Sequence, residues 1–259
     1  MAIETLGVVL KATPIRESDL LLTLFTEDHG KLSAVARGAR RSQKRFTGAL
    51  QLLVLARFQL GRRPRGELWS LDNADIVREW SAISRDVVGV AHASYAAELL
   101  GALVPAETPE PAALELVVAL WDSLADAGPS VAALRAYELA VLDVAGHRPA
   151  LDRCAACGAV DLETGAVFDP GRGGAICRRC AATSRDPGVR PLAAGTLAYL
   201  RAIAASESIA AARAFDDGVL AEDRIAAREA MLAMVTALAG HPLKTLEYLA
   251  KLSSATRRE

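Results

Sequence analysis

Two pairs of cysteines constrain the fold of this chain more than any other feature of its sequence. They form the pattern C-x2-C-x19-C-x2-C and consist of Cys154, Cys157, Cys177 and Cys180. Each CxxC pair lets two thiolates from one tight turn reach the same ion, and two pairs complete a tetrahedral shell that suits Zn²⁺. Four protein ligands leave no position for water, so we expect one structural zinc ion in a small ribbon inserted over residues 150–188.

Other interpretations of the cysteines stay open at this point. Iron in a rubredoxin-like site needs the same four ligands, and the four positions can also be left empty. A redox role for one CxxC pair would leave the other pair unexplained. A disulfide framework is disfavoured because the N-terminus shows no secretory signal, which predicts a cytoplasmic protein in a reducing compartment. The apolar stretch 87–106 contains His92 and Glu98, so we expect no membrane span.

The first 80 residues alternate apolar and polar positions in the way that is typical of β-strands. Strands are predicted at residues 3–13, 20–26, 31–37, 52–60 and 67–77. Five short strands separated by turn signals suggest a small closed barrel. An OB-fold is the leading candidate because this five-stranded barrel binds oligonucleotides across a strand face bordered by its first and fourth loops. Those loops would be residues 14–19 and 61–66.

Aromatic residues of this region are candidates for stacking against nucleic-acid bases. The alternation places Phe58 on the core side of its strand, so we expect it to be a packing residue. Phe46, in the linker between the third and fourth strands, and Trp69 are better stacking candidates, although either residue can be buried instead.

From Ser84 the pattern changes to helical periodicity. Helices are predicted at residues 84–104, 111–127 and 131–146, which should pack together, and at 192–205, 222–240 and 242–254 after the cysteine ribbon. Tyr95, Trp121 and Tyr137 are expected in the helical core. The sequence therefore predicts an α+β multidomain protein, with an OB-fold β-barrel at 1–80 and an α-helical domain at 81–259 that carries the zinc ribbon.

Positive charge is concentrated in one part of a nearly neutral chain. Residues 31–65 contain ten Lys or Arg residues and no Asp or Glu, while the whole chain has a formal charge of −1. Such a run creates a local positive potential that attracts a polyanion, although it can also be a set of solubilising loops. The predicted DNA-contacting residues are Arg16, Lys31, Arg37, Arg40, Arg41, Lys44, Arg45, Arg57, Arg62, Arg63 and Arg65.

Common catalytic and nucleotide-binding motifs are absent from the sequence. It contains no Walker-type glycine-rich loop, no GxGxxG, no HExxH and no GxSxG. Its four histidines lie far apart and have no metal-ligand spacing. These observations favour a binding protein over an enzyme.

Several short segments resemble the family of the bacterial recombination mediator RecO. Most lie near the N-terminus, including Glu17-Ser18-Asp19, Gly30-Lys31-Leu32 and the segment from Ala36 to Arg41. Downstream matches are Tyr95 with Glu98-Leu99, Gly173-Gly174 before Cys177, and Pro242-Leu243-Lys244-Thr245, where the family usually has Ser in place of Thr245. The similarity runs nearly from end to end.

The resemblance implies a DNA repair and homologous recombination mediator of the RecF pathway, located in the cytoplasm with the nucleoid. Such a protein binds single- and double-stranded DNA and anneals complementary strands. The implied partners are RecR, the C-terminal tail of single-stranded DNA-binding protein and, indirectly, the recombinase RecA. The tail is acidic and needs a basic-rimmed apolar groove on the helical half, for which Arg135, Arg148 and Arg201 are guesses.

Two other functional classes remain. One is a zinc-ribbon adaptor in transcription or replication that recognises a protein partner, and the other is an RNA-acting enzyme with a structural zinc. A question about DNA contact also stays open. In a simple meander the linker cluster (Arg40 to Arg45) and the hairpin cluster (Arg62 to Arg65) lie at opposite ends of the sheet, so they hold either one DNA strand or two.

Overall fold

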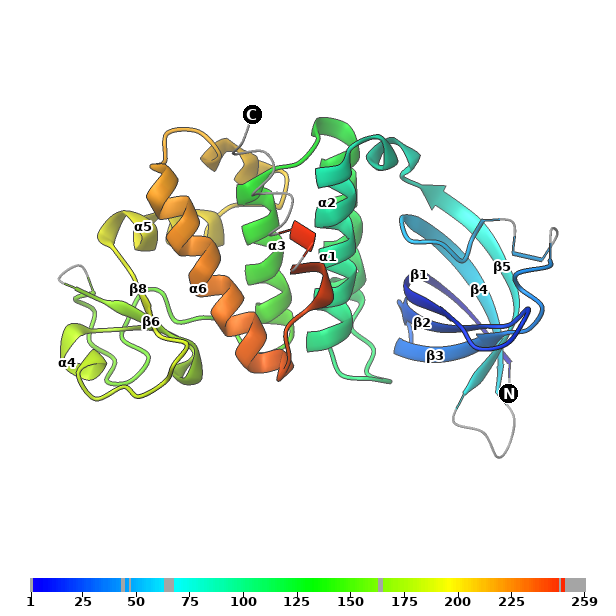
Figure 1. The fold of residues 1–259 in the computed structure, drawn as a ribbon, viewed down its shortest axis with the longest axis horizontal. Coiled ribbons are helices and arrows are strands. Elements are labelled where there is room, and N and C mark those ends of the chain that lie inside the picture. The colour runs from blue at the N-terminus through cyan, green and yellow to red at the C-terminus, as the bar shows by residue number, and fades with distance from the viewer. Residues whose placement is uncertain are drawn as a thin grey trace. The chain divides into compact units, whose positions relative to one another are not determined.

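A computed structural model of the chain describes residues 2–42, 45–46, 48–62, 68–162, 165–246 and 248–249 (Figure 1). Three predicted DNA-contacting residues, Lys44, Arg63 and Arg65, lie outside this part of the chain. The chain folds as two compact units, Met1–Gly128 and Pro129–Glu259. Among the described residues, none of the helices combines the length and the apolar character that a bilayer span requires.

The first unit begins with a closed five-stranded barrel, as predicted. Its strands are β1 (Ala2–Pro14), β2 (Leu20–Thr26), β3 (Gly30–Ala36), β4 (Val54–Arg62) and β5 (Trp69–Glu79). They follow the order β1-β2-β3-β5-β4, and β4 closes the ring by pairing with β1. The predicted OB-like barrel is confirmed, and its strand order differs from a simple meander, because β5 lies between β3 and β4. The two pairs that join β3 to β5, Ala34 with Trp69 and Val35 with Ser70, are parallel.

The alternation of the strands sets which side chains fill the barrel. Leu22 and Leu24 of β2, Leu32 of β3, and Phe58 and Leu60 of β4 are all buried in one apolar core. A shift of one residue in register would turn each of these side chains to the opposite face, so the pattern fixes the pairing. Phe58 is a packing residue, as predicted.

Phe46 and Trp69 are also core residues, so of the two alternatives left open for them, stacking against bases or burial, the structure shows burial. Their exposed fractions are 3% and 4%. A guanidinium covers each ring, with Arg45 5.0 Å from the centroid of Phe46 and Arg62 5.4 Å from that of Trp69. Both aromatic side chains come from irregular or terminal segments, where strand alternation does not indicate which way they point.

Two helices complete the first unit. The short helix η1 (Ser81–Arg85) leads into α1 (Val87–Leu103), where Asp86 caps the N-terminus by accepting a hydrogen bond from the Val88 N–H. Helix α2 (Pro111–Ala127) begins at Pro111 and ends before Gly128. The segment between the helices lies against the barrel, where Gly30 (φ +62°) contacts the Thr108 carbonyl so closely that a Cβ atom would clash.

The second unit contains the other helices and the cysteine ribbon. Helix α3 (Val131–Val144) begins at Ser130, whose side chain accepts a hydrogen bond from the Ala133 N–H. The compact units divide the chain between α2 and α3, so α1 and α2 are described with the barrel and α3 with the second unit. Tyr95, Trp121 and Tyr137 are fully buried, as predicted. The boundary between residues 80 and 81 stays a prediction.

The remaining elements follow α3 in chain order. They are β6 (Val167–Asp169), η2 (Pro170–Arg172), β7 (Gly174–Ile176), α4 (Arg178–Ala181), β8 (Arg190–Pro191), α5 (Ala194–Ala204), η3 (Ala211–Phe215) and α6 (Ala221–Ala239). Strands β7, β6 and β8 form a small antiparallel sheet in that order. Of the predicted helix 242–254, residues 244–246 and 248–249 are helical and the others after 249 lie outside the described residues.

Candidate functional site

The four cysteine sulfurs converge at one point of the second unit. The Sγ atoms of Cys154, Cys157, Cys177 and Cys180 all lie within 4.8 Å of one another. The distance between the sulfurs of Cys157 and Cys177 is 3.8 Å. Four sulfurs placed tetrahedrally at about 2.3 Å from a zinc ion would be about 3.8 Å apart, so the geometry fits a four-thiolate metal site. The predicted convergence of the two CxxC pairs is confirmed.

Short hydrogen bonds shape the first cysteine turn. The Cys154 N–H donates to the Ala159 carbonyl at 2.7 Å, and the Gly158 N–H donates back to the Cys154 carbonyl at 2.8 Å. Gly158 has φ +74°, a conformation that disfavours other residues. The Cys177 N–H donates to the sulfur of Cys154 at 3.3 Å, which ties the second turn to the first. We call residues 150–191, which carry both turns and the small sheet, the cysteine lobe.

The electrostatics of the lobe favour the thiolate, the metal-binding form of cysteine, at Cys154 and Cys157, whereas hydrogen bonding with Cys157 first, together with burial, raises the pKa of Cys180 to about 12. Burial raises the pKa of the Cys154 thiol, but hydrogen bonds from backbone N–H groups, Cys177 first, outweigh it and bring the pKa to about 6. A backbone hydrogen bond at Ala159 and one with Arg179 help to lower the pKa of Cys157. Arg179 therefore points at the metal site, and contact with the thiol of Cys157 raises its own pKa.

A second candidate site lies on the barrel, where five described arginines surround the β1–β2 loop. We call Arg16, Arg37, Arg40, Arg41 and Arg45 the loop cluster. The Arg40 N–H donates to the Ser18 carbonyl at 3.0 Å and the Gly38 N–H donates to the Asp19 carboxylate at 2.8 Å. These bonds fasten the linker after β3 to the β1–β2 loop, so residues far apart in sequence share one surface.

Most cations of the loop cluster have partners within the chain. Arg41 forms an ion pair of 3.0 Å with Glu17, and Arg40 donates to the Glu17 carbonyl at 3.2 Å. Arg45 donates to the Arg37 carbonyl at 2.7 Å, and Arg16 lies 3.9 Å from Asp19. These contacts are at the surface, where an ion pair contributes little stability and a phosphate can replace the carboxylate.

The other predicted DNA-contacting residues of the barrel lie apart from the loop cluster. Arg62 lies 3.8 Å from Glu107 and over Trp69, whose ring centroid is 6.4 Å from that of His29 in the β2–β3 turn. Arg57 forms an ion pair of 3.6 Å with Glu4 on the neighbouring strand. The loop cluster lies at one end of β2 and Arg62 near the other.

Two exposed cations of the barrel have no hydrogen-bond or ion-pair partner for their side chains among the described residues, Arg37 and Lys11. Lys11 lies on β1, just after a break in register between Val9 and Lys11. Lys11 is not among the predicted DNA-contacting residues, because it lies outside the basic run at residues 31–65.

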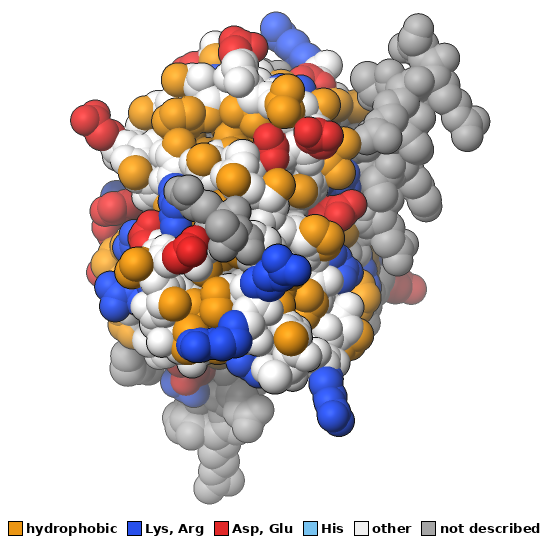
Figure 2. Space-filling model, turned by 90° about the vertical axis from the view of Figure 1, so that its left-hand side faces the viewer, with side chains coloured by type: hydrophobic (Ala, Val, Ile, Leu, Met, Phe, Trp, Pro, Cys, Tyr) orange, Lys and Arg blue, Asp and Glu red, His pale blue; other side chains and the backbone are white. Residues whose placement is uncertain are grey.

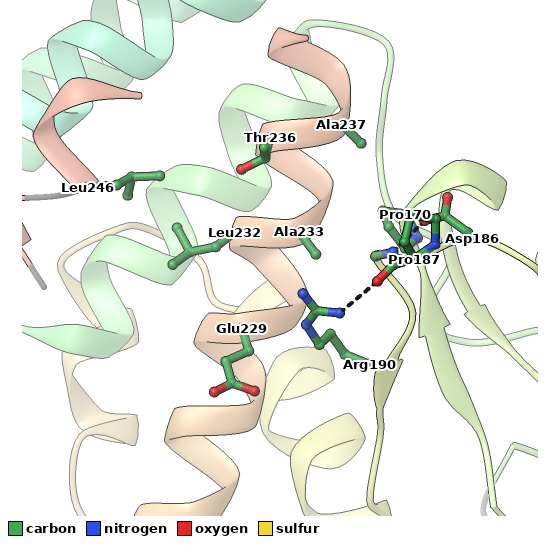
Figure 3. A pocket seen from close by; sticks show the side chains of 11 residues that line it. Pro170, Asp186, Pro187, Arg190, Glu229, Leu232, Ala233, Thr236, Ala237 and Leu246 are labelled. Atoms are coloured by element: carbon green, nitrogen blue, oxygen red, sulfur yellow. Dashed lines mark hydrogen bonds between the residues drawn. The ribbon is translucent and has the colours of Figure 1, made fainter. Parts of the chain in front are cut away.

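A groove in the second unit separates the cysteine lobe from α6 (Figure 3). It has a volume of about 610 Å³, and its lining includes the apolar side chains of Pro187 and Leu232 together with Arg190 and Glu229. The Arg190 guanidinium donates to the carbonyls of Pro187 at 3.2 Å and Val189 at 2.9 Å. Since Glu229 and Asp186 also line the groove, its rim is of mixed charge rather than basic.

The three arginines that were guesses for an acidic partner all have acceptors within the chain. Arg135 is buried in α3 and forms an ion pair of 2.7 Å with Glu138. Arg148 pairs with Asp143 at 3.3 Å, and Arg201 with Asp152 at 3.3 Å. Because these side chains lie on different elements and are engaged, they do not form a basic rim around the groove.

Comparison with known proteins identifies relatives along nearly the whole chain. The family model "Recombination protein O N terminal" matches residues 1–80, and "Recombination protein O C terminal" matches residues 84–253. The DNA repair protein RecO of Anaeromyxobacter sp. strain K is 46% identical over 214 residues, which cover 79% of this chain and 82% of that protein. The RecO protein of Symbiobacterium thermophilum is 34% identical over 256 residues, 96% of this chain and 97% of that protein.

Proposed function

The chain belongs to the RecO family of DNA repair proteins, and from this premise we propose that it binds single- and double-stranded DNA and anneals complementary strands. As a mediator of homologous recombination in the RecF pathway, it would help to load recombinase onto DNA covered by single-stranded DNA-binding protein. It would act by binding rather than by catalysing a reaction, in the cytoplasm at the nucleoid.

The loop cluster is the observation that carries this proposal. It concentrates five arginines where the linker after β3 meets the β1–β2 loop, which borders the ligand-binding face of OB-folds. Guanidinium groups bind phosphates through paired N–H donors, and each one engaged with a phosphate releases condensed counterions. In the free protein the Glu17 carboxylate holds Arg41 and the Glu17 carbonyl holds Arg40, so DNA binding would exchange these two acceptors for phosphate oxygens.

Annealing requires that two polyanions come close together. Fixed cations lower the repulsion between two phosphate backbones, so a protein with cations at separate places can hold two strands near each other. The loop cluster and Arg62 lie near opposite ends of β2, with Arg57 on a neighbouring strand. We propose that these residues, with Lys31, Lys44, Arg63 and Arg65, contact DNA.

The cysteine site supports a structural role for the proposed metal. Four thiol ligands suit zinc, and a site closed by four protein sulfurs leaves no position for a reacting water. We propose one zinc ion per chain, held by Cys154, Cys157, Cys177 and Cys180. The metal would stabilise the cysteine lobe and supply no chemistry at the barrel.

The proposed partners follow from family membership. They are RecR, the acidic C-terminal tail of single-stranded DNA-binding protein and, indirectly, RecA. The mixed rim of the groove beside α6 gives no reason to place the acidic tail there, since Glu229 and Asp186 would repel it.

A fluorescence annealing assay tests the proposal. Complementary oligonucleotides would be mixed with the protein across a salt series, with and without single-stranded DNA-binding protein. We expect faster annealing, and an affinity for single strands that falls with salt at a log–log slope of about 0.7 per phosphate contact. A chain that neither binds single strands nor anneals them at low salt would contradict the proposal.

A further inference from the structure

The cysteine lobe carries exposed arginines that the fold does not use. Arg153, Arg178 and Arg185 are exposed, and their guanidinium groups have no hydrogen-bond or ion-pair partner among the described residues. On the barrel, by contrast, most of the described arginines that were predicted to contact DNA have acceptors within the chain. Exposed guanidinium groups that form no internal ion pair are ready to bind an external anion, because no internal contact has to break first.

The metal site fixes the positions of two of these arginines. Arg153 precedes Cys154 and Arg178 follows Cys177, and the Cys177 N–H donates to the sulfur of Cys154 at 3.3 Å. Arg185 follows Ser184, whose hydroxyl donates to the buried carboxylate of Asp169 at 2.6 Å. The backbone at all three arginines is therefore next to residues whose positions are fixed by hydrogen bonds within the lobe.

The three arginines are not needed to offset the negative charge of the thiolates. Arg179 already does so, because its guanidinium contacts the thiol of Cys157. The acidic side chains of the lobe are largely engaged as well. Asp169 is buried, Asp152 pairs with Arg201, and Asp186 accepts a hydrogen bond from the Gly188 N–H at 2.6 Å.

The net charge of the lobe shows what kind of contact it can make. The lobe contains six arginines and five carboxylates, which give it a net charge of +1. A zinc ion held by four thiolates would add a charge of −2 and change the net charge to −1. Long-range attraction of a polyanion is therefore weak, and binding must come from short-range contacts with single phosphates. Figure 2 shows the side of the molecule on which the lobe lies, with blue cationic side chains standing out over its lower part.

We infer that Arg153, Arg178 and Arg185 of the cysteine lobe contact the phosphate backbone of a single DNA strand, distinct from the strand bound at the barrel. The inference rests on the proposed function, since the barrel must hold the first strand. The lobe and the barrel lie in different compact units. Each unit then has its own phosphate-binding surface, and annealing brings together two strands that are held separately.

Salt dependence gives the expected size of the effect. Each phosphate contact on a single strand contributes about 0.7 to the log–log slope of affinity against salt, so losing three contacts lowers the affinity about 30-fold at about 0.2 M salt. This loss applies to the second strand. Binding of the first strand at the barrel should stay within about twofold of the parent chain.

The experiment uses the full chain and two non-complementary single strands, one carrying a donor dye and the other an acceptor dye. Energy transfer between them reports that the protein holds both strands. The lobe variant is R153Q/R178Q/R185Q. The charge-matched control is R148Q/R172Q/R201Q, which removes three arginines of the same unit that are paired with Asp143, Asp169 and Asp152.

We expect the lobe variant to lose energy transfer and to anneal complementary strands at least about tenfold more slowly at moderate salt, with its metal content unchanged. The control should behave like the parent chain. Energy transfer equal to that of the parent overturns the inference, and so does an equal loss in the control or a loss of metal from the lobe variant. If the parent chain neither binds single strands nor bridges them, the proposed function itself fails. If the parent bridges strands and the lobe variant does so equally well, only the inference about the lobe fails.

Discussion

The ammonium group of Lys31 donates a hydrogen bond of 2.7 Å to the carbonyl oxygen of Gly101 in the last turn of α1. A cation at this position satisfies a carbonyl that the helix leaves free and interacts favourably with the helix dipole. The same residue joins the barrel to the segment after α1 through its backbone, since the Glu107 N–H donates to the Lys31 carbonyl at 3.1 Å.

Lys31→Met should therefore lower the free energy of unfolding by more than it lowers the free energy of DNA binding. We expect a loss of about 1.5 kcal/mol in the free energy of unfolding, measured by urea denaturation, because one hydrogen bond from a charged group is lost. DNA affinity should fall less than in Arg37→Gln, which removes an exposed cation. A larger loss of affinity in the Lys31 variant than in the Arg37 variant, at unchanged stability, would contradict the structural role and leave Lys31 with its proposed DNA contact alone.

The pH dependence of this variant adds a second test. Burial lowers the pKa of Lys31 below its usual 10.5. Between the lowered pKa and 10.5 the unfolded chain binds more protons than the folded chain, so the contribution of Lys31 makes stability rise with pH. The parent should gain stability relative to Lys31→Met as the pH rises through that window. A constant difference between the two chains would contradict this expectation.

Glu17→Gln should strengthen DNA binding. It removes the carboxylate that pairs with Arg41 at 3.0 Å, so this arginine becomes available to phosphate and a repulsive charge disappears. We expect affinity for single strands to rise severalfold at low salt and the difference to shrink as salt increases, as fluorescence anisotropy can measure. Glu115→Gln, an exposed change of equal charge on α2, is the control. Equal affinities of the Glu17 and Glu115 variants would show that only net charge matters.

Removal of the metal should unfold the cysteine lobe and leave DNA contact at the barrel largely intact. We expect elemental analysis to find one zinc ion per chain and none in Cys154→Ser, while a strong chelator lowers the thermal stability of the second unit. Zinc affinity should fall as the pH is lowered, because protons compete with the metal for the four sulfurs. Metal-free protein with unchanged stability would refute the site.

Asp122 should stabilise the first unit through two partners. Its carboxylate accepts a hydrogen bond of 2.6 Å from the Trp80 indole and one of 3.0 Å from Arg78. Asp122→Ala leaves the indole N–H without its acceptor, so we expect a loss of about 1–3 kcal/mol in the free energy of unfolding. Asp126→Ala, an exposed change on the same helix, should alter stability by less than about 0.5 kcal/mol. Similar losses in both variants would argue against the role of the carboxylate.

The sequence predicted the features of this fold that depend on local pattern. Strand alternation identified five strands, and the spacing of the cysteines predicted the convergence of their sulfurs, because two short turns can meet without knowledge of the rest of the chain. Strand order depends instead on distant contacts. The pairing of Ala34 with Trp69, which places β5 between β3 and β4, leaves no mark on the alternation of either strand.

The ion-pair partners of the arginines in residues 31–65 also could not be predicted from the sequence. Residues 31–65 contain no acid, yet Arg41 pairs with Glu17 and Arg62 with Glu107, and both carboxylates lie outside the run. Charge density along the chain therefore located the basic region, but it did not separate cations that are engaged from those that are free. Arg37 and Lys11 could be recognised as free cations only from the folded barrel.

The junction of β3 and β5 sets how the barrel can form. The other neighbouring strands share seven or more residue pairs, whereas β3 and β5 share two. The strands therefore make up a continuous antiparallel ribbon, β3-β2-β1-β4-β5, whose two outer strands close the barrel through two parallel pairs. Because these outer strands share few pairs and are far apart in the sequence, closure gains little energy for its entropic cost, and we expect it to be a slow, late step of folding.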